Sequence, residues 1–512
     1  MLRNIGAFVC WTLLSACAGF SQVNPPRFPL GVYAHVDVEA ATQRKPCSEA
    51  TTVAALHMCL QQLYSGLLET PAISGIAAGV HWDHIQLSDP LCVFQNNCAS
   101  GTVDGYDWSY VDDVFTEANA AGKSVLLMIT PGVDAPPWLL AKLPTCDGLF
   151  NGAGGAPADC GQVTFDNFPE EQHADGDPPV LPLPWNPLYI AAWDDLLAHL
   201  NQRYRSNTAF VAIGVAGPVC ASTEMILPTT ANNSTTPPPS NLGADQAWMA
   251  LIAHSFPDVS RYQNSDQVFI DAWKQTIDAY ERIFSGVTLF LSPDSGSDLP
   301  ELPSVLRDNT LLSVDCSTAK QPLSCQAKTE VLSYFVTAAG PNQKATQVGG
   351  MTASSQPTTG DIGVPGVKVL TSMETPPFFG GAEFDFAVSD STTVEQEGCP
   401  SWPNTPCMPF GFTLTPEEAA YNVLTVFFDG TSAYADFGGT SGTEPIQYVE
   451  LDYTDIQYAQ KNPCATLPST LPGAPSLQDL INLASYDLFG MAGQQTTLPP
   501  HTCPTSDATP GR

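Results

Sequence analysis

Two short segments of the chain each place a glutamate after an apolar run, in a setting of Ser or Thr and Met. Glu224 lies in segment 215–226, and Glu374 lies in segment 368–377. Each apolar run predicts a buried strand, so two strand ends would deliver the two carboxylates into one cleft. Such a pair can cleave a glycosidic bond, because one carboxyl group protonates the leaving oxygen while the other attacks the sugar carbon.

The separation of the two carboxyl groups would decide the stereochemistry of that reaction. A gap of about 5 to 5.5 Å suits hydrolysis with retention of configuration, whereas about 6.5 to 9.5 Å leaves room for a water molecule and suits inversion. Repulsion between two carboxylates raises the pKa of one of them, which keeps the general acid protonated. We expect retention, with Glu224 and Glu374 as the catalytic groups.

Eight apolar segments alternate with helical patterns along the chain. The expected strands are 31–37, 73–82, 124–130, 210–215, 287–292, 346–352, 367–373 and 447–453. The expected helices between them are 50–68, 106–121, 188–204, 268–284, 325–338 and 416–428. Apolar strands separated by helices predict a parallel sheet covered on its faces, and eight such units predict an α/β fold closed into a (β/α)8 TIM barrel. An open, doubly wound sheet is the main alternative, but no glycine-rich phosphate-binding segment follows the first strand.

Long polar insertions fall mainly after strands rather than before them. They span 83–105, 131–187, 220–246 and 375–415. In a barrel, the loops that follow strands lie on the C-terminal face, where active sites are found. Glu224 would follow the fourth strand and Glu374 the seventh, so we expect both at this face.

The cysteines fall into close pairs that match the long loops. Of 15 cysteines, Cys10 and Cys17 lie in the first 22 residues. The others pair by spacing as Cys47 with Cys59, Cys92 with Cys98, Cys146 with Cys160, Cys316 with Cys325, Cys399 with Cys407, and Cys464 with Cys503. These pairs predict disulfide bonds that brace loops in an oxidising compartment. Cys220 is left over and is expected to be a buried free thiol.

The start of the chain carries the pattern of an export signal. Arg3 is followed by an apolar run over 5–16 and then by small residues, which predicts a secretory signal peptide. The segment Leu14-Ser-Ala-Cys17 also resembles a bacterial lipobox, so a lipid anchor at Cys17 is an alternative end to the signal. No other segment is apolar enough to span a membrane. We therefore expect an extracellular or periplasmic protein with a signal peptide at 1–22, a barrel domain at 23–460 and a C-terminal extension at 461–512.

The charge of the chain restricts its partners. The sequence has 52 Asp and Glu against 18 Lys and Arg, which gives a formal net charge of −34. Such a chain repels nucleic acid and anionic lipid surfaces. A neutral oligosaccharide or polysaccharide is therefore a suitable substrate, and nucleic acid is not an expected partner.

The order of these elements resembles clan A glycoside hydrolases, the retaining (β/α)8 families, over residues 31–456. The local matches are the two glutamate segments, Val-His-Trp at 80–82, and Tyr-Asp-Trp at 106–108 with Val-Asp-Asp-Val at 111–114. The resemblance is greatest to the β-galactosidase-like and cellulase-like branches. It implies that Glu224 is the acid/base and Glu374 the nucleophile. Many members have Asn before the acid/base, where this chain has Thr223, so the resemblance does not specify the sugar.

Aromatic residues and histidines at the expected strand ends suit a sugar-binding cleft. Trp82, Trp138 and Trp185 could stack on the apolar faces of sugar rings. His35 and His81 could donate hydrogen bonds to sugar hydroxyls. Loop packing explains each tryptophan equally well, and a structural role explains each histidine equally well.

Glu224 and Glu374 could each have a structural role instead, by capping a helix or pairing with an arginine. Other carboxylates could then take the catalytic role. They are Asp294 and Asp298 after the fifth strand, Glu383 and Asp385 after the seventh, and Glu450 within the eighth. Glu450 is the first substitute, because it could point into the barrel.

Two other functions stay open as alternatives. One is a carbohydrate-binding barrel without catalysis. The other is a metal-dependent hydrolase, suggested by His81-Trp-Asp-His84. A strand end would not bring these side chains onto one face, and no second cluster occurs, so we expect no metal and no cofactor. No Gly-x-Ser-x-Gly segment indicates a serine hydrolase.

Overall fold

The computed structural model describes the chain in several ranges. These are 28–150, 155–165, 179–219, 225–230, 243–263, 265–292, 299–300, 302, parts of 327–346, the strand backbones at 351–352 and 378–385, 446–461, 463 and 477–491. The expected signal peptide and the Cys17 lipobox lie outside the described residues. No helix among these ranges is long and apolar enough to cross a membrane.

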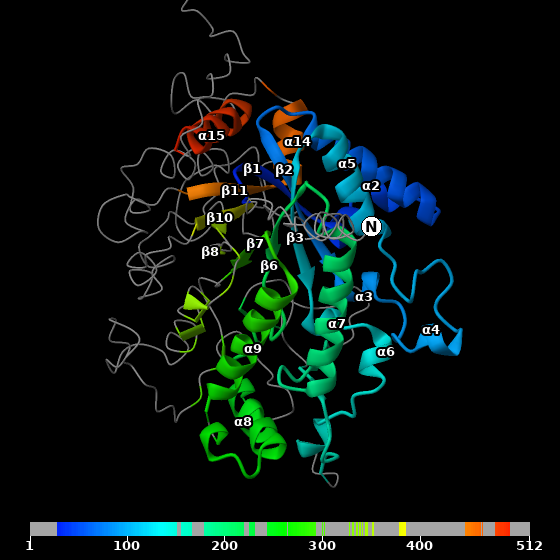
Figure 1. Ribbon diagram of the computed structural model, residues 1–512, viewed down its shortest axis with the longest axis vertical. Helices are drawn as coiled ribbons and strands as arrows, with labels where there is room; N and C mark the ends of the chain where they lie inside the picture. The colour runs from blue at the N-terminus through cyan, green and yellow to red at the C-terminus, as the bar shows by residue number, and fades with distance from the viewer. Residues whose placement is uncertain are drawn as a thin grey trace, which may run out of the picture.

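Within the described ranges, nine parallel strands form the main sheet (Figure 1). They are β1 (Gly31–Asp37), β2 (Ile73–His81), β3 (Ser124–Thr130), β6 (Phe210–Gly214), β7 (Thr288–Leu291), β8 (Lys344–Thr346), β9 (Met351–Thr352), β10 (Phe378–Asp385) and β11 (Ile446–Asp452). The order is β11-β1-β2-β3-β6-β7-β8-β10-β9, and β10 also pairs with β11. The pairing thus passes through eight strands and returns to its start, with β9 attached outside this eight-strand ring. The topology is consistent with a TIM-barrel-like fold.

Helices lie between the strands of the ring and after it. They are α1 (Val38–Gln43), α2 (Val53–Leu68), α3 (Trp82–Ile85), α4 (Cys92–Gln95), α5 (Ser109–Ala121), α6 (Pro137–Leu140), α7 (Pro187–Tyr204), α8 (Ala244–Ser255), α9 (Gln267–Ile283), α14 (Tyr453–Lys461) and α15 (Leu477–Met491). A hairpin of β4 (Gln162–Thr164) and β5 (Val180–Pro182) lies in the insertion after β3.

Local chemistry fixes where the long helices begin and end. Thr52 caps α2 by accepting a hydrogen bond from the backbone N–H of Ala55. Asn186 caps α7 in the same way, ahead of a proline at the first helical position. Gly122 ends α5 with a φ of 66°, a left-handed conformation that favours glycine. The sequence therefore predicted these helices to within a few residues.

The apolar residues form two clusters that the strands separate. The larger cluster includes Val32, Ala34 and Val36 of β1 and packs the strands against the helices. The smaller one contains only strand residues: Tyr33, Ala77, Leu126, Met128, Val211, Ala212, Phe290 and Tyr448. Except at the neighbours Val211 and Ala212, members of the second cluster alternate along their strands with residues of the larger one. Because successive side chains of a strand point to opposite faces, the second cluster lies on the face away from the helices. Strands from most of the ring therefore share an inner core.

The last strands of the ring differ from the prediction. The expected sixth strand, 346–352, is two elements: β8 ends at Thr346 and belongs to the ring, while β9 pairs only with β10. The expected seventh strand, 367–373, lies outside the described residues. The seventh position of the ring is occupied by β10, which the sequence had placed in a loop. A Pro-Pro pair precedes β10 and two glycines interrupt it, so its local sequence resembles a loop. Its hydrogen bonds to β8 and β11 make this segment a strand.

Three predicted disulfides are present in the described residues. They join Cys47 to Cys59, Cys92 to Cys98, and Cys146 to Cys160. The other three expected pairs and Cys220 lie outside these residues. The bonds to Cys98 and Cys160 brace the insertions after β2 and β3, as predicted.

Close strand packing makes one glycine of β2 hard to replace. A Cβ atom on Gly75 would overlap the backbone oxygen of Ser124 and lie 2.7 Å from Cε1 of Tyr33. We expect Gly75→Ala to lower the free energy of unfolding by about 2–3 kcal/mol, because strand backbone has to shift. Gly66→Ala in α2 is the control: its Cβ meets no atom within 4 Å, and the change should stabilise by about 0.5–1 kcal/mol. Urea denaturation of both variants checks this, and equal stabilities would contradict the packing of β2 against β3.

Candidate active site

Four ionisable side chains converge where β1, β2 and β3 end. Asp37 is the last residue of β1 and His81 the last of β2, while Glu39 and Asp134 lie in the segments that follow β1 and β3. We call Asp37, Glu39, His81 and Asp134 the rim cluster. Residues that follow parallel strands lie at the C-terminal edge, so the cluster occupies the edge where barrel enzymes carry their chemistry.

His81 is the centre of the rim cluster. Its Nδ1 lies 2.7 Å from a carboxylate oxygen of Glu39 and 3.3 Å from one of Asp134. Its Nε2 lies 3.9 Å from a carboxylate oxygen of Asp37. Only 20% of the His81 side chain is exposed, and 7% of Asp134, against about a third of the two other acids. The cluster is therefore a half-buried ionic network with an open side formed by Asp37 and Glu39.

The network shifts two proton affinities. Desolvation alone would lower the pKa of His81, but the hydrogen bond to Glu39 and the charges of Asp134, Asp37 and Glu39 outweigh it and raise the pKa to about 10. Burial raises the pKa of Asp134 to about 7, although His81 acts to lower it. The site therefore holds an imidazolium near neutral pH beside a carboxyl group that titrates there. A carboxyl group with such a pKa is suited to proton transfer.

The turns that carry the acids are fixed by their own hydrogen bonds. Asp37 caps α1 by accepting a hydrogen bond of 2.7 Å from the backbone N–H of Ala40. Asp134 lies in a short 3-10 turn after β3, and Gly132 within it has a φ of 73°. The backbone N–H of Gly132 donates to the Tyr189 hydroxyl of α7 at 3.2 Å. Both acids are thus held in place independently of His81.

A row of stacked rings lies behind His81. Its ring stacks on His84 at 5.4 Å between centroids, and His84 stacks on Tyr110 of α5 at 5.6 Å. Tyr110 contacts His57 of α2, whose Nδ1 lies 2.7 Å from Asp113. The sequence had indicated that His81 and His84 would not share a face. The structure corrects this, because a turn of helix begins directly after β2 and brings the two rings together.

Ionisable and aromatic side chains also lie on the inner face of the ring, toward the N-terminal ends of the strands from the rim cluster. Along β1, Tyr33, His35 and Asp37 alternate onto one face, and Tyr33 belongs to the inner core. The strand register places Tyr33 opposite Glu450 of β11, and His35 opposite Asp452. Glu450 is fully buried and raises the pKa of Tyr33 and Tyr448 by its charge, after the larger effect of burial. Glu450 thus lies inside the ring, as the sequence suggested it could.

Glu224 lies outside the described residues, but its flanking residues do not. β6 is the fourth strand of the ring, and the chain from Val215 to Val219 follows it. Met225 is fully buried, and its backbone N–H donates to the carbonyl of Ser292, directly after β7, at 3.1 Å. The residue next to Glu224 is therefore attached to the C-terminal edge of the ring.

Glu374 also lies outside the described residues, and its position in the chain order differs from the expectation. It precedes β10, the seventh strand of the ring, instead of following it. Residues before a parallel strand enter at the opposite end from those after it. β10 itself carries Glu383, which lies in register with Glu450 of β11.

The predicted tryptophans lie in three different environments. Trp82 is fully buried and donates its indole N–H to Gln86 at 2.8 Å, so in this structure it packs the core and has no face open to a sugar. Trp138 is half-buried, donates to the carbonyl of Gln86 at 3.1 Å, and lies under the ammonium group of Lys142. Trp185 packs in a separate aromatic group with Trp248, Phe256 and Phe269. The rim cluster therefore contains only His81 of the five predicted substrate-binding residues.

The sequence reasoning missed three members of the rim cluster. Asp37, Glu39 and Asp134 were not singled out, although Asp37 ends the predicted strand 31–37 and the other two lie within four residues after a predicted strand. The rule that barrel chemistry gathers after strands could have identified all three. Within the described ranges, no group of three or more His, Cys, Asp or Glu side chains is arranged to hold a metal ion.

Comparison with known proteins gives no family. No protein-family model matches the chain, and no curated protein matches it. Solved structures that resemble it include a β-galactosidase from Bacillus circulans sp. alkalophilus, at TM-score 0.34 and 10% identity over 70% of this chain and 45% of that one. A psychrophilic family 10 endo-β-1,4-xylanase has TM-score 0.31 and 10% identity, covering 83% and 86%. A β-galactosidase from the psychrophilic Marinomonas ef1 has TM-score 0.28 and 11% identity, covering 82% and 54%.

These similarities are small. This chain spans about half the length of the two β-galactosidases. Similarity at this level assigns neither a family nor an activity, so function has to be argued from the chain's own residues.

Proposed function

We propose that this chain is an exported glycoside hydrolase that cleaves O-glycosidic bonds of a neutral oligosaccharide or polysaccharide. Its ring of strands forms a (β/α)8 barrel, and the reaction proceeds with retention of configuration through Glu224 and Glu374. The observation that carries the proposal is the rim cluster at the C-terminal edge of eight cyclically paired parallel strands. Neither a metal nor an organic cofactor enters the proposed chemistry.

The rim cluster supplies what a bound sugar needs. The carboxylates of Asp37 and Glu39 are partly exposed and can accept hydrogen bonds from sugar hydroxyls. The imidazolium of His81 offsets part of their charge and can donate a hydrogen bond to a sugar oxygen. The cluster therefore suits one subsite of a sugar cleft.

The two glutamates divide the reaction in the proposed mechanism. Glu224 protonates the leaving oxygen while Glu374 attacks the anomeric carbon and forms a glycosyl-enzyme. Glu224 then removes a proton from the water that releases the sugar. Glu383 is the structural competitor for the role of nucleophile, because it belongs to the seventh strand and lies in register with Glu450.

Turnover and stereochemistry test this function directly. The purified protein should hydrolyse at least one member of a panel of neutral 2,4-dinitrophenyl glycosides. Proton NMR of the first product should show the anomeric configuration of the substrate. Release of the opposite anomer would replace retention with inversion, and no turnover of any glycoside would remove the hydrolase assignment.

A carbohydrate-binding barrel without catalysis is the second candidate. The chain order favours testing it, because Glu374 precedes the seventh strand of the ring whereas Glu224 follows the fourth. Isothermal titration with the same sugars distinguishes the two functions. Sugar binding without turnover in the intact chain would support the non-catalytic function.

A further inference from the structure

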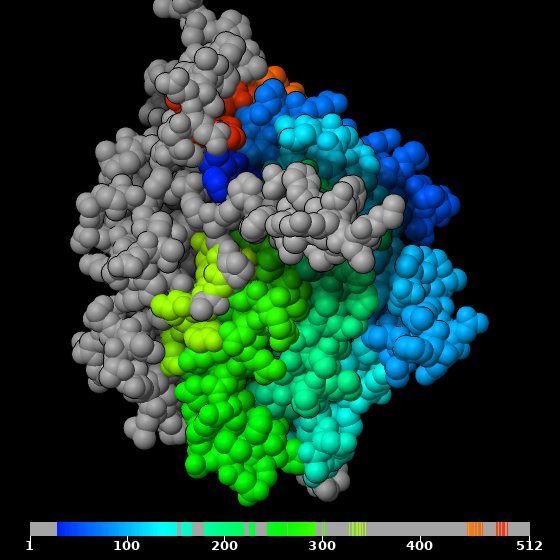
Figure 2. All heavy atoms as spheres, in the orientation of Figure 1, coloured from blue at the N-terminus to red at the C-terminus, as the bar shows by residue number. Residues whose placement is uncertain are grey.

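Part of the insertion between β2 and α5, residues 87–103, presents an amide-rich surface with one charged side chain. Phe94 has 87% of its surface exposed, the highest value among the large apolar residues of the described chain. The next three residues, Gln95, Asn96 and Asn97, are also exposed. Leu91, Val93 and Val103 are 47–62% exposed in the same insertion. We call residues 87–103 the Phe94 loop, and Figure 2 shows it standing out from the side of the molecule near the position of α4.

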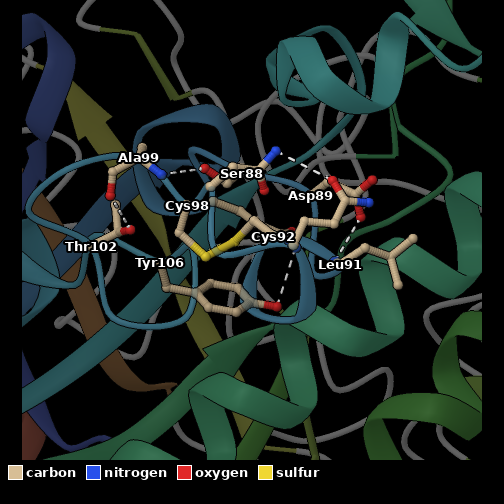
Figure 3. The surroundings of a disulfide bond; sticks show 11 residues. Ser88, Asp89, Leu91, Cys92, Cys98, Ala99, Thr102 and Tyr106 are labelled. Atoms are coloured by element: carbon tan, nitrogen blue, oxygen red, sulfur yellow. Dashed lines mark hydrogen bonds between the residues drawn. A yellow bond between two sulfur atoms is a disulfide. The ribbon is translucent and has the colours of Figure 1, made fainter.

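The Phe94 loop is braced from within. The Cys92–Cys98 disulfide closes its tip, and the hydroxyl of Ser88 accepts a hydrogen bond of 2.9 Å from the backbone N–H of Ala99 (Figure 3). Asn96 and Gly101 turn the chain with φ angles of 55° and 86°. The exposed ring of Phe94 is therefore carried on an ordered turn. Because the loop is already ordered, it loses little further conformational entropy when a ligand binds.

The loop also connects to the rim of the ring. It begins a few residues after His81, and the carbonyl of Gln86 accepts the indole N–H of Trp138 from the insertion after β3. Asp89 forms an ion pair with Lys142 of that second insertion. The two insertions thus support one another at the C-terminal edge, and the Phe94 loop extends this edge outward.

We infer that the Phe94 loop is a secondary binding site for a neutral polysaccharide, outside the catalytic cleft. This rests on the proposed function and adds a polymeric substrate class to it. The ring of Phe94 stacks on the apolar face of a pyranose, and the side-chain amides of Gln95, Asn96 and Asn97 bond its hydroxyls. One sugar unit of a polysaccharide would bind at the Phe94 loop, while other units of the same polymer extend to the rim cluster and into the cleft.

The charge and composition of the loop favour a sugar over other occupants. Asp89, the one charged side chain in 87–103, is paired with Lys142, and the exposed Asp104 follows this range. The tip of the loop around Phe94 therefore complements a neutral ligand and does not attract an anionic one. Insertion into a bilayer would bury three amide side chains beside Phe94. Asn97 donates a hydrogen bond to Gln95 at 3.2 Å, but the amide of Asn96 would lose its hydrogen bonds to water, at a cost that one ring does not offset. A second copy of a chain with net charge −34 is repelled.

Affinity electrophoresis in gels that contain hydroxyethyl cellulose, arabinoxylan, galactan or amylose tests the inference. The intact chain should be retarded by at least one polymer, and Phe94→Ala should weaken that binding about tenfold. Met58→Ala is the matched control, because Met58 is 55% exposed on α2 and should leave binding unchanged. Turnover of a small aryl glycoside should be the same in all three proteins.

The outcomes separate this inference from the proposed function. Binding that depends on Phe94 supports the site even in a chain without hydrolase activity, which would refute only the catalytic assignment. Absence of retardation by all four polymers, or equal binding by the Phe94 and Met58 variants, overturns the inference. Phe94-dependent binding to phosphatidylcholine vesicles without polymer binding, or Phe94-dependent dimerisation, also overturns it in favour of a lipid surface or a second copy.

Discussion

Glu224→Gln should reduce turnover of an unactivated oligosaccharide by about 10²–10⁴-fold, the usual contribution of a general acid. The first step needs acid assistance only when the leaving group is poor, so the same variant should form the glycosyl-enzyme readily from a 2,4-dinitrophenyl glycoside. Adding azide should then speed release and yield a glycosyl azide of retained configuration. A variant that is equally impaired on both substrates and unaffected by azide would exclude Glu224 as the acid/base.

The same experiment identifies the nucleophile. Glu374→Ala should lower turnover of even the activated glycoside by about 10⁴-fold or more, as expected when the attacking group is lost. Azide should restore activity and give a glycosyl azide of inverted configuration. Glu383→Ala is the decisive comparison, because Glu383 lies in the seventh strand of the ring whereas Glu374 precedes it. If Glu383→Ala lost turnover and was rescued by azide, while Glu374→Ala kept normal turnover, the nucleophile would be Glu383 of β10.

The choice between these two glutamates depends on which segment forms the seventh strand. Strand 124–130 was predictable to the residue because a continuous apolar run is bounded by clear turn signals. Segments 367–373 and 378–385 are both apolar, and the second contains two glycines that lower its strand propensity. Only pairing with β8 and β11 identifies β10 as a member of the ring, and such pairing is a long-range property.

The candidate site shows the same limit. From its place at a strand end, His81 was predicted as a residue that could donate hydrogen bonds to sugar hydroxyls. The structure places it in the rim cluster, and its contact with a ligand stays a prediction. Its partners Glu39 and Asp134 come from segments more than 40 residues away on either side, so their contact follows from the ring and not from local spacing. Trp82, one residue further on, points into the core, because helix α3 starts there and turns the chain.

His81→Gln should lower the free energy of unfolding by about 3 kcal/mol at neutral pH, because it leaves the carboxylates of Glu39 and Asp134 facing each other without a cation. We place the loss at the lower end of the range for broken buried pairs, since Glu39 and Asp37 are about one third exposed and partly screened. Urea denaturation at several pH values measures it. His254→Gln is the control, because the ring of His254 bonds the carbonyl of Pro157 and not a carboxylate.

The raised pKa values of His81 and Asp134 predict that the stability of the folded chain falls as the pH rises. The pKa of His81 is about 10 in the folded chain against an ordinary 6.5, so its stabilisation is complete below pH 6.5 and is lost as the pH rises through 10. Asp134, with a pKa of about 7 against an ordinary 3.8, likewise makes stability fall as the pH rises from 3.8 to 7. Without the cation the pKa of Asp134 rises further, so the His81→Gln variant keeps a decline that Asp134 causes. The variant should lose the His81 decline that extends to pH 10, and its stability should approach that of the parent there. If the variant kept that decline, a group other than the rim imidazolium would be titrating, and the rim could not be the cation-centred subsite from which sugar binding has been argued.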